Sequence, residues 1–415
     1  MMVALLAILI IIFLFLFAYR ITHSIIHPAV VTSAIWSILL ICYNTIDHVL
    51  YPLSDKFYLA LLLWVVPFCI MSLIWSRISS ARPSFIGRSS NKKLVNFLLP
   101  LTFLSLFIVI FSLYRVGINE NSDNVFNGIR AASIEALKEG TPMLPAYAGI
   151  FAQFAIPAVL IFFLIGFVEK RDNRILFVVF SLLLFTFTLI RMNKVAVAQL
   201  LLGVIFLLIY YKKLSLKKAG FIFLFFVALM IIPQLLRSSA EAGSFDLIRF
   251  LSIYMLAPLP AFDSVLTGNT DFIDSFHGEY TFRFIVSLLQ NLGLDITGNR
   301  DPFNLDNWVQ VPLPLNVYTV MFNFYVDFGM WGIFIFSSLL GSFWGWLYNK
   351  IKHGKSHYII IYAALFYTLV FQFFMDYFFT FFINTLLVII VTCILYIHIQ
   401  LHPDSSSNCN RIKNN

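Results

Sequence analysis

Several cations lie beside long apolar stretches, where a charge is costly unless an anion accompanies it. Arg191 and Lys194 occupy a short turn between two apolar runs, and Arg237 follows another apolar run. Arginine binds phosphate oxygens through two parallel hydrogen bonds, and the N-terminus of a helix beginning at Lys194 adds a favourable dipole. These residues predict a phosphate-binding site, to which we assign Arg191, Lys194, Arg237, Arg249 and Arg283. The alternative is that they reach lipid headgroups or pair with nearby acids.

A second set of side chains has the chemistry of a general base. Removing a proton from a hydroxyl needs a carboxylate or an imidazole within hydrogen-bond reach. Asp327 stands among aromatic residues in the run YVDFG, where a carboxylate is expensive to place. We predict Asp327, Glu279 and His277 as catalytic candidates, with Asp263 as a further one. The alternative role of Asp327 is to cap the helix that follows, and His277 is alternatively a solvated surface residue.

Aromatic residues accompany these acids and arginines. Tyrosine rings stack on sugars, and the candidates for sugar binding are Tyr254, Tyr280, Tyr318 and Tyr325, with Trp308 beside them. The alternative is an aromatic belt at a membrane surface, where tyrosine and tryptophan are common.

The sequence lacks the motifs of most soluble transferases and hydrolases. It has no P-loop, no glycine-rich dinucleotide fingerprint, no zinc-binding spacing of His and Cys, and no G-x-S-x-G. It also has no D-x-D pair to hold a divalent ion. We therefore expect no metal ion and no cofactor, and a substrate that is already activated when it arrives.

Composition places this chemistry in a membrane. The 415 residues are 60% hydrophobic and only 12% charged, with a mean hydropathy of +0.89. A soluble domain cannot bury that much apolar surface, so the fold class is an all-α polytopic integral membrane protein. The net charge of +8 comes from cations in short loops between apolar runs, which argues against a nucleic-acid partner. The four cysteines do not form a disulfide pattern.

The apolar runs predict about eleven membrane spans, since about twenty residues cross a bilayer and packed spans can be shorter. The first run is interpreted as a retained helix because no basic residue precedes it. The spans are expected at 3–19, 29–46, 57–76, 94–114, 147–168, 175–190, 195–211, 219–236, 331–349, 357–375 and 378–398.

Charge asymmetry predicts the orientation. With these spans, one side carries 18 of the 28 Lys and Arg but only 3 of the 20 Asp and Glu. Its most basic loops are 77–93, 212–218 and 350–355. The positive-inside rule makes this side cytoplasmic, which puts the N-terminus outside and the C-terminus inside.

The predicted organisation follows from these spans. An N-terminal transmembrane bundle of about eight spans covers 1–236, a long outer loop 237–330, the C-terminal transmembrane helices 331–398, and a cytoplasmic tail 399–415. Outside the bilayer we expect amphipathic helices at 125–137, within the outer segment 115–146, and at 246–259 and 282–292. Residues 291–314 are predicted loop, and 315–328 an interfacial or re-entrant helix that leads into the span at 331.

The order of these features resembles the Wzy-type O-antigen polymerases, also called oligosaccharide repeat-unit polymerases. The runs that carry the resemblance are RMNKVAVAQLLLG, Leu235-Leu236-Arg237, YMLAPLPAFDSV, HGEYTFRF and NVYTVMFNFYVDFGMWG. The last run is also similar to the O-antigen ligases, in which a histidine and a small polar residue precede a G-x-x-G signature. Here Tyr318 and Thr319 take the first positions, and Gly329 and Gly332 supply the glycines.

The resemblance implies a substrate and a compartment. The substrate would be an undecaprenyl-diphosphate-linked oligosaccharide repeat unit, transferred without a metal at the periplasmic face of a bacterial inner membrane. Partners would be membrane lipids, a flippase and a chain-length regulator. Arg191 and Arg237 would bind the diphosphate, Arg283 would contact phosphate or sugar, and Asp327 or Glu279 would orient or deprotonate the acceptor hydroxyl.

Three other functions fit parts of the sequence. A periplasmic ligase would use the same donor, but Tyr318 stands where ligases have a histidine, which favours the polymerase. A flippase or transporter of the same lipid should carry charges at mid-span, and here the predicted span interiors are nearly free of charge. A non-catalytic regulator of chain length would tolerate the loss of each outer arginine singly.

Overall fold

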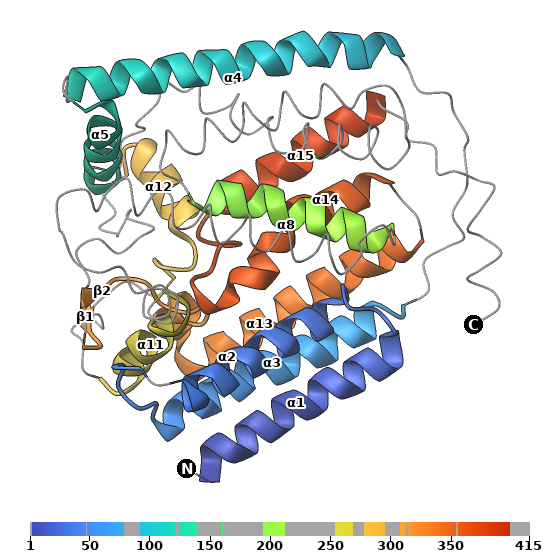
Figure 1. Cartoon of the computed structure of the whole chain (residues 1–415), viewed down its shortest axis with the longest axis vertical. Helices are drawn as coiled ribbons and strands as arrows, with labels where there is room; N and C mark the ends of the chain where they lie inside the picture. The colour runs from blue at the N-terminus through green and yellow to red at the C-terminus, as the bar shows by residue number, and fades with distance from the viewer. Residues whose placement is uncertain are drawn as a thin grey trace. The chain divides into compact units, whose positions relative to one another are not determined.

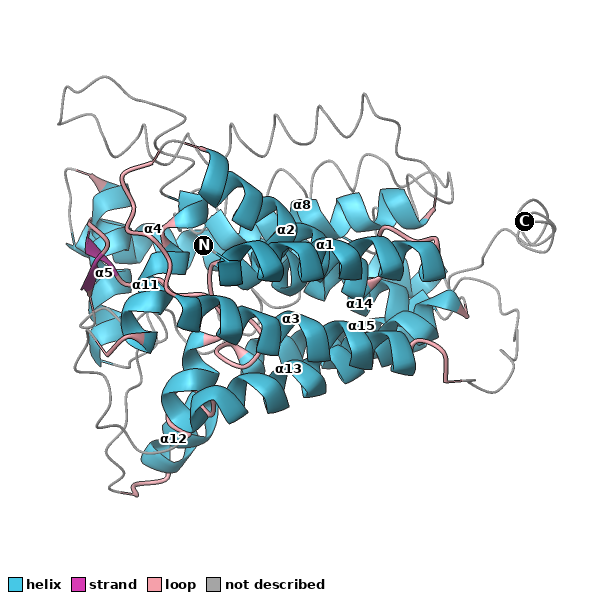
Figure 2. Cartoon of the chain, turned by 90° about the horizontal axis from the view of Figure 1, so that it is seen from below, coloured by secondary structure: helices cyan, strands magenta, loops and turns pink. Residues whose placement is uncertain are grey.

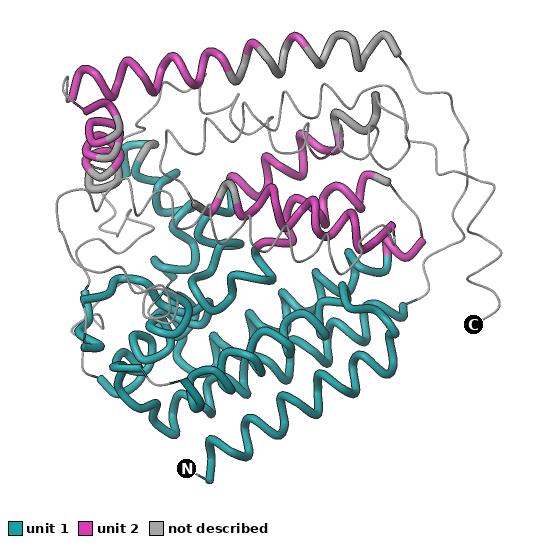
Figure 3. Tube along the Cα trace, viewed as in Figure 1, with its two compact units in different colours: residues 1–80, 242–349, 368–383 teal, residues 81–241, 350–367, 384–415 magenta. Residues whose placement is uncertain are grey.

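The computed structural model describes residues 2–46, 48–78, 92–120, 124–139, 160, 194–211, 254–268, 278–294, 308–312, 314–353 and 356–398. In this part of the chain nearly all regular structure is helical (Figure 1). The chain divides into two compact units (Figure 3). Unit 1 comprises residues 1–80, 242–349 and 368–383, and unit 2 comprises residues 81–241, 350–367 and 384–415.

Within the described residues, four helices are long and apolar enough to cross a membrane, which indicates a helical membrane protein. They are α1 (Met2–Thr22), α2 (Pro28–Thr45), α3 (Asp55–Trp75) and α13 (Phe322–Lys352). They correspond to the spans predicted at 3–19, 29–46, 57–76 and 331–349. The spans predicted at 147–168, 175–190 and 219–236 lie essentially outside the described residues, so the number eleven stays a prediction.

Side chains at the helix starts explain where α2 and α3 begin. The His27 ring accepts a hydrogen bond from the Ala29 amide at 3.2 Å, and Pro28 provides the first helical residue. Ser54 accepts from the Phe57 amide at 3.4 Å at the start of α3. Each cap satisfies an amide that the first helical turn leaves without a backbone partner.

Helices α3 and α13 run parallel and touch along a row of small residues (Figure 2). A Cβ on Gly341 would lie 2.5 Å from the Phe68 carbonyl oxygen, and one on Gly345 would lie 2.4 Å from that of Ser72. One turn earlier, the Ser337 hydroxyl donates to the Leu63 carbonyl at 3.2 Å. Small residues four apart let two membrane helices approach closely. This row, Ser337–Gly341–Gly345, fixes the register of the pair.

The parallel pair has consequences for topology. Asn349, near the end of α13, donates to the Trp75 carbonyl at the end of α3, at 3.3 Å. The basic residues Lys350 and Lys352 and the beginning of the predicted basic loop 77–93 therefore lie at one end of the pair. Parallel spans need an odd number of crossings between them, and the five predicted crossings meet that requirement.

A buried amide joins α2 and α3 to the segment after α14. The Gln372 carbonyl oxygen accepts from the indole nitrogens of Trp36 at 3.3 Å and Trp64 at 3.0 Å. Its amide nitrogen donates to the Thr32 hydroxyl at 3.0 Å. Because an unpaired buried polar group is costly, this network specifies the position of residues 371–373 between the two helices.

Unit 2 contains α4 (Lys92–Glu120), α5 (Val125–Glu139), α8 (Lys194–Tyr210) and parts of α14 (Ser356–Val370) and α15 (Phe382–His398). Helix α5 confirms the helix predicted at 125–137. Within this unit Gln199 of α8 donates to the Ala364 carbonyl of α14 at 2.9 Å. The Phe206 and Tyr362 rings stack at 4.6 Å.

The structure corrects the last two predicted spans. Helix α14 ends at Val370 and is followed by a 3-10 turn at Phe371–Phe373, and α15 begins only at Phe382. A non-helical turn therefore separates them over residues 374–381, where 357–375 and 378–398 were predicted to be almost continuous.

The long loop is also more structured than predicted. In the predicted 246–259 helix the described residues 254–256 are helical, and after a turn at Ala257 helix α11 runs from Pro258 to Leu266, past the predicted end. The predicted helix at 282–292 is confirmed as α12 (Arg283–Asn291). The predicted loop 291–314 includes β1 (Val309–Gln310), which pairs antiparallel with β2 (Pro314–Leu315).

Candidate functional site

The site is built on a break in α13. Gly329 has φ 62° and ψ −153°, so the segment from Phe322 to Phe328 is a separate helical piece that leads into the long helix. This confirms a short helix before the span at 331, beginning at Phe322 and not at 315. That backbone conformation is nearly restricted to glycine. A Cβ on Gly332 would lie 2.1 Å from the Phe324 carbonyl oxygen, so glycine is needed there for close packing.

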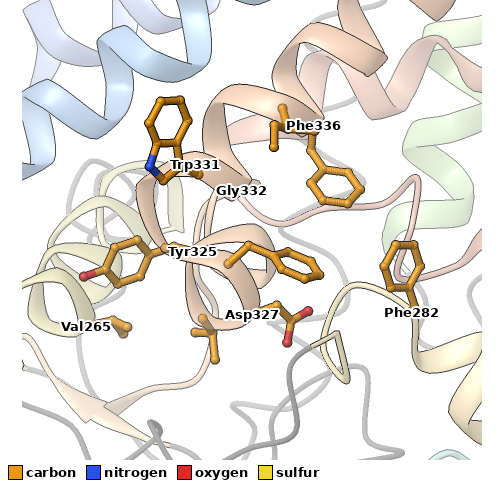
Figure 4. A pocket seen from close by; sticks show the side chains of 11 residues that line it. Val265, Phe282, Tyr325, Asp327, Trp331, Gly332 and Phe336 are labelled. Carbon is orange, nitrogen blue, oxygen red and sulfur yellow. The ribbon is translucent and has the colours of Figure 1, made fainter.

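A cavity of about 810 Å³ opens beside this break (Figure 4). Non-helical backbone at membrane depth is tolerated where it lines such a space. Among the lining residues, Asp327 is the one carboxylate in an otherwise mainly apolar wall. The wall is formed by Val265, Phe282, Tyr325, Val326, Asp327, Phe328, Gly329, Trp331, Gly332, Ile335 and Phe336.

Asp327 is held in place by a distant turn. Its Oδ2 accepts from the Thr281 amide at 2.6 Å, and its Oδ1 accepts from the Tyr280 amide at 3.2 Å. The residue is 2% exposed, and its side chain lies between Tyr325 and Phe282 in Figure 4. The carboxylate therefore fixes the 278–282 turn against the broken helix. A carboxylate can accept about four hydrogen bonds, so this anchoring is compatible with a ligand contact.

Three other predicted residues gather around the same turn. Glu279 is buried, and Arg283 is buried with its guanidinium carbon 5.0 Å from the centre of the Tyr280 ring. A cation over an aromatic face is a stabilising contact. The Thr281 hydroxyl also donates to the Asn323 carbonyl at 3.4 Å, which ties the turn to the first turn of α13.

The predicted sugar-binding tyrosines divide into two groups. Tyr325 lines the cavity. Tyr280 and Tyr318 do not, because both rings are buried against Phe322, at 5.6 Å and 4.2 Å between ring centres. Tyr254 is half-buried and stacks on Phe374 at 5.9 Å, away from the lining residues. Trp331, which is 75% exposed, adds an aromatic ring to the wall that the sequence reasoning missed.

Asp263 is a structural residue. Its two carboxylate oxygens accept from the amide and the hydroxyl of Ser54, the first at 2.7 Å. Asp263 thereby joins α11 to the start of α3, and it does not line the cavity. Burial raises the pKa of this carboxyl, although the two Ser54 hydrogen bonds oppose the shift.

Other predicted positions cannot be placed at the site. His277, Arg191, Arg237 and Arg249 lie outside the described residues. Helix α8 begins at Lys194, as predicted, but it belongs to unit 2, and only the backbone of Lys194 is described. The phosphate-binding group of Arg191, Lys194, Arg237 and Arg249 therefore stays a prediction.

Sequence reasoning missed the buried carboxylate of Asp376. Its oxygens accept from the amides of Phe378 at 3.0 Å, Phe379 at 3.1 Å and Thr380 at 3.3 Å. Asn323, one turn before Asp327 on the same helical piece, donates to the Thr380 hydroxyl at 2.8 Å. Burial raises the pKa of Asp376 to about 6, although the three amides and Asn323 favour the charged form. A lone acid in the aromatic run FFMDYFF was the available signal, the same signal that identified Asp327.

The arrangement favours binding of a ligand that is partly apolar and partly hydroxylated. An apolar wall takes hydrocarbon or sugar-ring faces, and Asp327 accepts a hydrogen bond or a proton from a hydroxyl. No group of three or more His, Cys, Asp or Glu suited to a metal ion is found within the described residues. The chain was compared with protein-family models, with curated proteins and with solved structures, and none of them matches it.

Proposed function

We propose that this protein is a glycosyltransferase that polymerises undecaprenyl-diphosphate-linked oligosaccharide repeat units at the periplasmic face of the bacterial inner membrane, in O-antigen biosynthesis. The observation that carries the proposal is the cavity at the helix break, where one buried carboxylate, Asp327, stands in an apolar wall. A lipid-linked sugar can contact the apolar wall and the carboxylate at the same time, because its hydrocarbon and its hydroxyl groups lie close together at the head of the molecule.

The position of the cavity supports the same proposal. Lys350 and Lys352 lie in the last turn of α13, and the helix break at Gly329 lies near the other end of the helix. Under the positive-inside rule that basic end is cytoplasmic, which puts the cavity near the periplasmic surface. Lipid-linked repeat units are polymerised on that side, after the cytoplasmic steps that need nucleotide sugars.

The proposed reaction balances without a metal. A hydroxyl oxygen of the acceptor repeat unit attacks the anomeric carbon of the donor, and the bond between that carbon and the diphosphate oxygen breaks. The bonding electrons leave with the diphosphate, and the hydroxyl proton passes to the Asp327 carboxylate. Cations stabilise the departing charge, and we assign this role to Arg283 together with the predicted group Arg191, Lys194, Arg237 and Arg249.

The environment of Tyr318 favours polymerase over ligase. In the resemblance to ligases this position corresponds to a histidine. Here the side chain is 2% exposed, its ring stacks on Phe322, and burial raises the pKa of the phenol. Such a residue packs the interior of the site, and it is a poor proton acceptor at neutral pH.

The test is the lipopolysaccharide ladder of a strain that lacks the gene. We expect core carrying a single repeat unit, and a full ladder after complementation with the wild type. Asp327→Asn keeps the shape of the side chain but cannot take the proton, so it should leave the strain at one repeat. The matched control is Asp263→Asn, a buried carboxylate outside the cavity, at equal protein level by immunoblot.

Other outcomes would identify another function. No repeat on the core would indicate a ligase or a flippase. A ladder that persists with a changed length distribution would indicate a chain-length regulator. A full ladder with Asp327→Asn would exclude Asp327 as the base.

A further inference from the structure

Helix α12 carries an apolar edge that the described part of the protein does not cover. Along this edge Ile285 is 40% exposed, Leu288 is 56% exposed and Leu292, just after the helix, is 71% exposed. Residues three and four apart lie on one side of a helix. The other side is buried, since Val286 and Arg283 are each 5% exposed. The helix is therefore strongly amphipathic, and its apolar side faces outward.

Ring contacts fix the start of α12 beside the spanning helix α13. The Phe282 ring lies 5.9 Å from Phe336 and 6.3 Å from Phe328, between ring centres. The Phe284 ring stacks on Phe382, the first residue of α15, at 4.6 Å. The start of α12 thus lies between the levels of Phe328 and Phe336, beside the helix break at Gly329.

Helix geometry converts this level into a depth. Lys350 marks the basic end of α13, and a hydrocarbon layer of about 30 Å takes about twenty helical residues at 1.5 Å each. Counting back twenty residues from Lys350 places the far boundary near residue 330, at the helix break. Phe336 is then about 9 Å inside that boundary and Phe328 about 3 Å outside it, so the beginning of α12 lies at the boundary between hydrocarbon and headgroups. Amphipathic helices at an interface bury their apolar side by about 5–10 Å.

The span beside α12 has exposed apolar residues of its own. On α13, Phe334 and Leu339 are 41% and 54% exposed, and they occupy the part of the helix that is long and apolar enough to cross the membrane. Exposed apolar residues on a spanning helix are expected to face acyl chains. The edge of α12 is equally apolar, and its helix begins beside this span, so we assign it the same occupant.

We infer that α12 is a membrane-inserted helix, with its Ile285–Leu288–Leu292 edge in contact with acyl chains. The bilayer then positions the 278–282 turn, whose amides bind Asp327, because this turn leads directly into α12. Asp327 is thereby held between a membrane-anchored turn and the break in α13. The lipid contact holds whatever reaction the cavity performs, and only its effect on catalysis depends on the proposed function.

Photo-crosslinking tests the lipid contact in the full-length protein. Benzoylphenylalanine is placed at Leu288, at Leu339 of α13 as the lipid-facing reference, or at Thr267 as an exposed reference at the end of α11. Each protein is reconstituted into vesicles of phosphatidylethanolamine and phosphatidylglycerol with alkyne-tagged acyl chains, and illuminated. We expect Leu288→benzoylphenylalanine to label lipid at a yield close to that at Leu339 and well above that at Thr267.

Each other outcome overturns the inference. A yield at Leu288 equal to that at Thr267 would place the edge in water. A crosslinked product at twice the mass of the chain would place a second copy on the edge. If the Leu288 variant does not elute as a folded protein in gel filtration, Leu292 on the same edge takes its place, with the same expectations. Neither result depends on glycan transfer, so failure here leaves the proposed function untouched.

Discussion

Two buried carboxylates hold turns in unit 1, and they do so over very different sequence distances. Asp376 accepts from amides two, three and four residues later, whereas Asp327 accepts from amides 47 and 46 residues earlier. Each side chain is 2% exposed. Only Asp327 lines the cavity. The local carboxylate builds its own turn, and the distant one joins the long loop to the helix break.

The difference suggests that one carboxylate has a structural role only, whereas the other can also contact a ligand. Asp376 has a local structural role that any acid in the same turn could fill. Its contacts through Asn323 and Thr380 support the first turn of α13. Asp327 combines anchoring with a place on the wall where a ligand can reach it. We therefore expect the two residues to respond differently to the same substitution.

The largest expected effect is on activity. In a purified polymerisation assay, Asp327→Asn should lower kcat by about 10²–10⁴-fold, the usual contribution of a general base. Asp376→Asn should keep activity close to the wild type per folded protein, because it lies outside the cavity. Equal losses in the two variants would remove the distinction drawn between them.

Truncation of the local carboxylate should act on stability. At pH 5, Asp376→Ala leaves three buried amides without their acceptor, at about 1–3 kcal/mol each. We expect the free energy of unfolding to fall by about 4 kcal/mol, whereas Asp376→Asn retains an acceptor oxygen and loses less. Thermal unfolding of both variants in the same detergent gives the comparison. An unchanged melting temperature for Asp376→Ala would mean that water replaces the carboxylate.

The raised pKa of Asp376 makes the stability of the folded protein depend on pH. The pKa of Asp376 is about 6 in the folded protein, against an ordinary value of 3.8, so the folded state binds the proton more tightly. The stability that proton binding to Asp376 contributes to the folded state is complete below pH 3.8, and it is lost as pH rises through about 6. At about 1.36 kcal/mol per unit, the wild type should lose about 2 kcal/mol relative to Asp376→Asn between pH 4 and pH 7. A difference between the two proteins that does not change with pH would contradict the raised pKa.

The smallest expected effect concerns the backbone between the carboxylate and the span. A Cβ at Gly329 would meet no atom within 4 Å, so the cost of Gly329→Ala comes only from its φ of 62°. We expect a loss of about 1–3 kcal/mol in thermal unfolding. Gly332→Ala is the control for packing, since its Cβ would clash with the Phe324 carbonyl. If Gly329→Ala costs nothing, the break does not need a glycine.

Much of the helical framework follows from sequence pattern. Apolar runs located α1, α2, α3 and the long part of α13, because a run of about twenty apolar residues has few other stable solutions. The amphipathic helices α5 and α12 were also recognisable. The ends of α14 and α15 were not, because aromatic residues on both sides of Asp376 continue the apolar pattern through a turn that only the carboxylate's hydrogen bonds reveal.

The candidate site was predictable in part. A lone acid among aromatic residues pointed to Asp327, and the same pattern around Asp376 was passed over. The sugar-binding role of Tyr280 and Tyr318 stays a prediction: sequence shows that a ring is present but not which way it packs, and both rings pack against Phe322, outside the lining of the cavity.

The sequence by itself determined that this is a helical membrane protein with a basic end and an acidic, aromatic loop, because composition and the period of apolar runs depend on local chemistry alone. Only the tertiary structure decided that Asp327 meets the 278–282 turn, that Gly329 breaks the helix beside a cavity, and that Asp263 belongs to the scaffold. Those contacts join segments far apart in the chain, and no local pattern encodes which distant amide a buried carboxylate will bind.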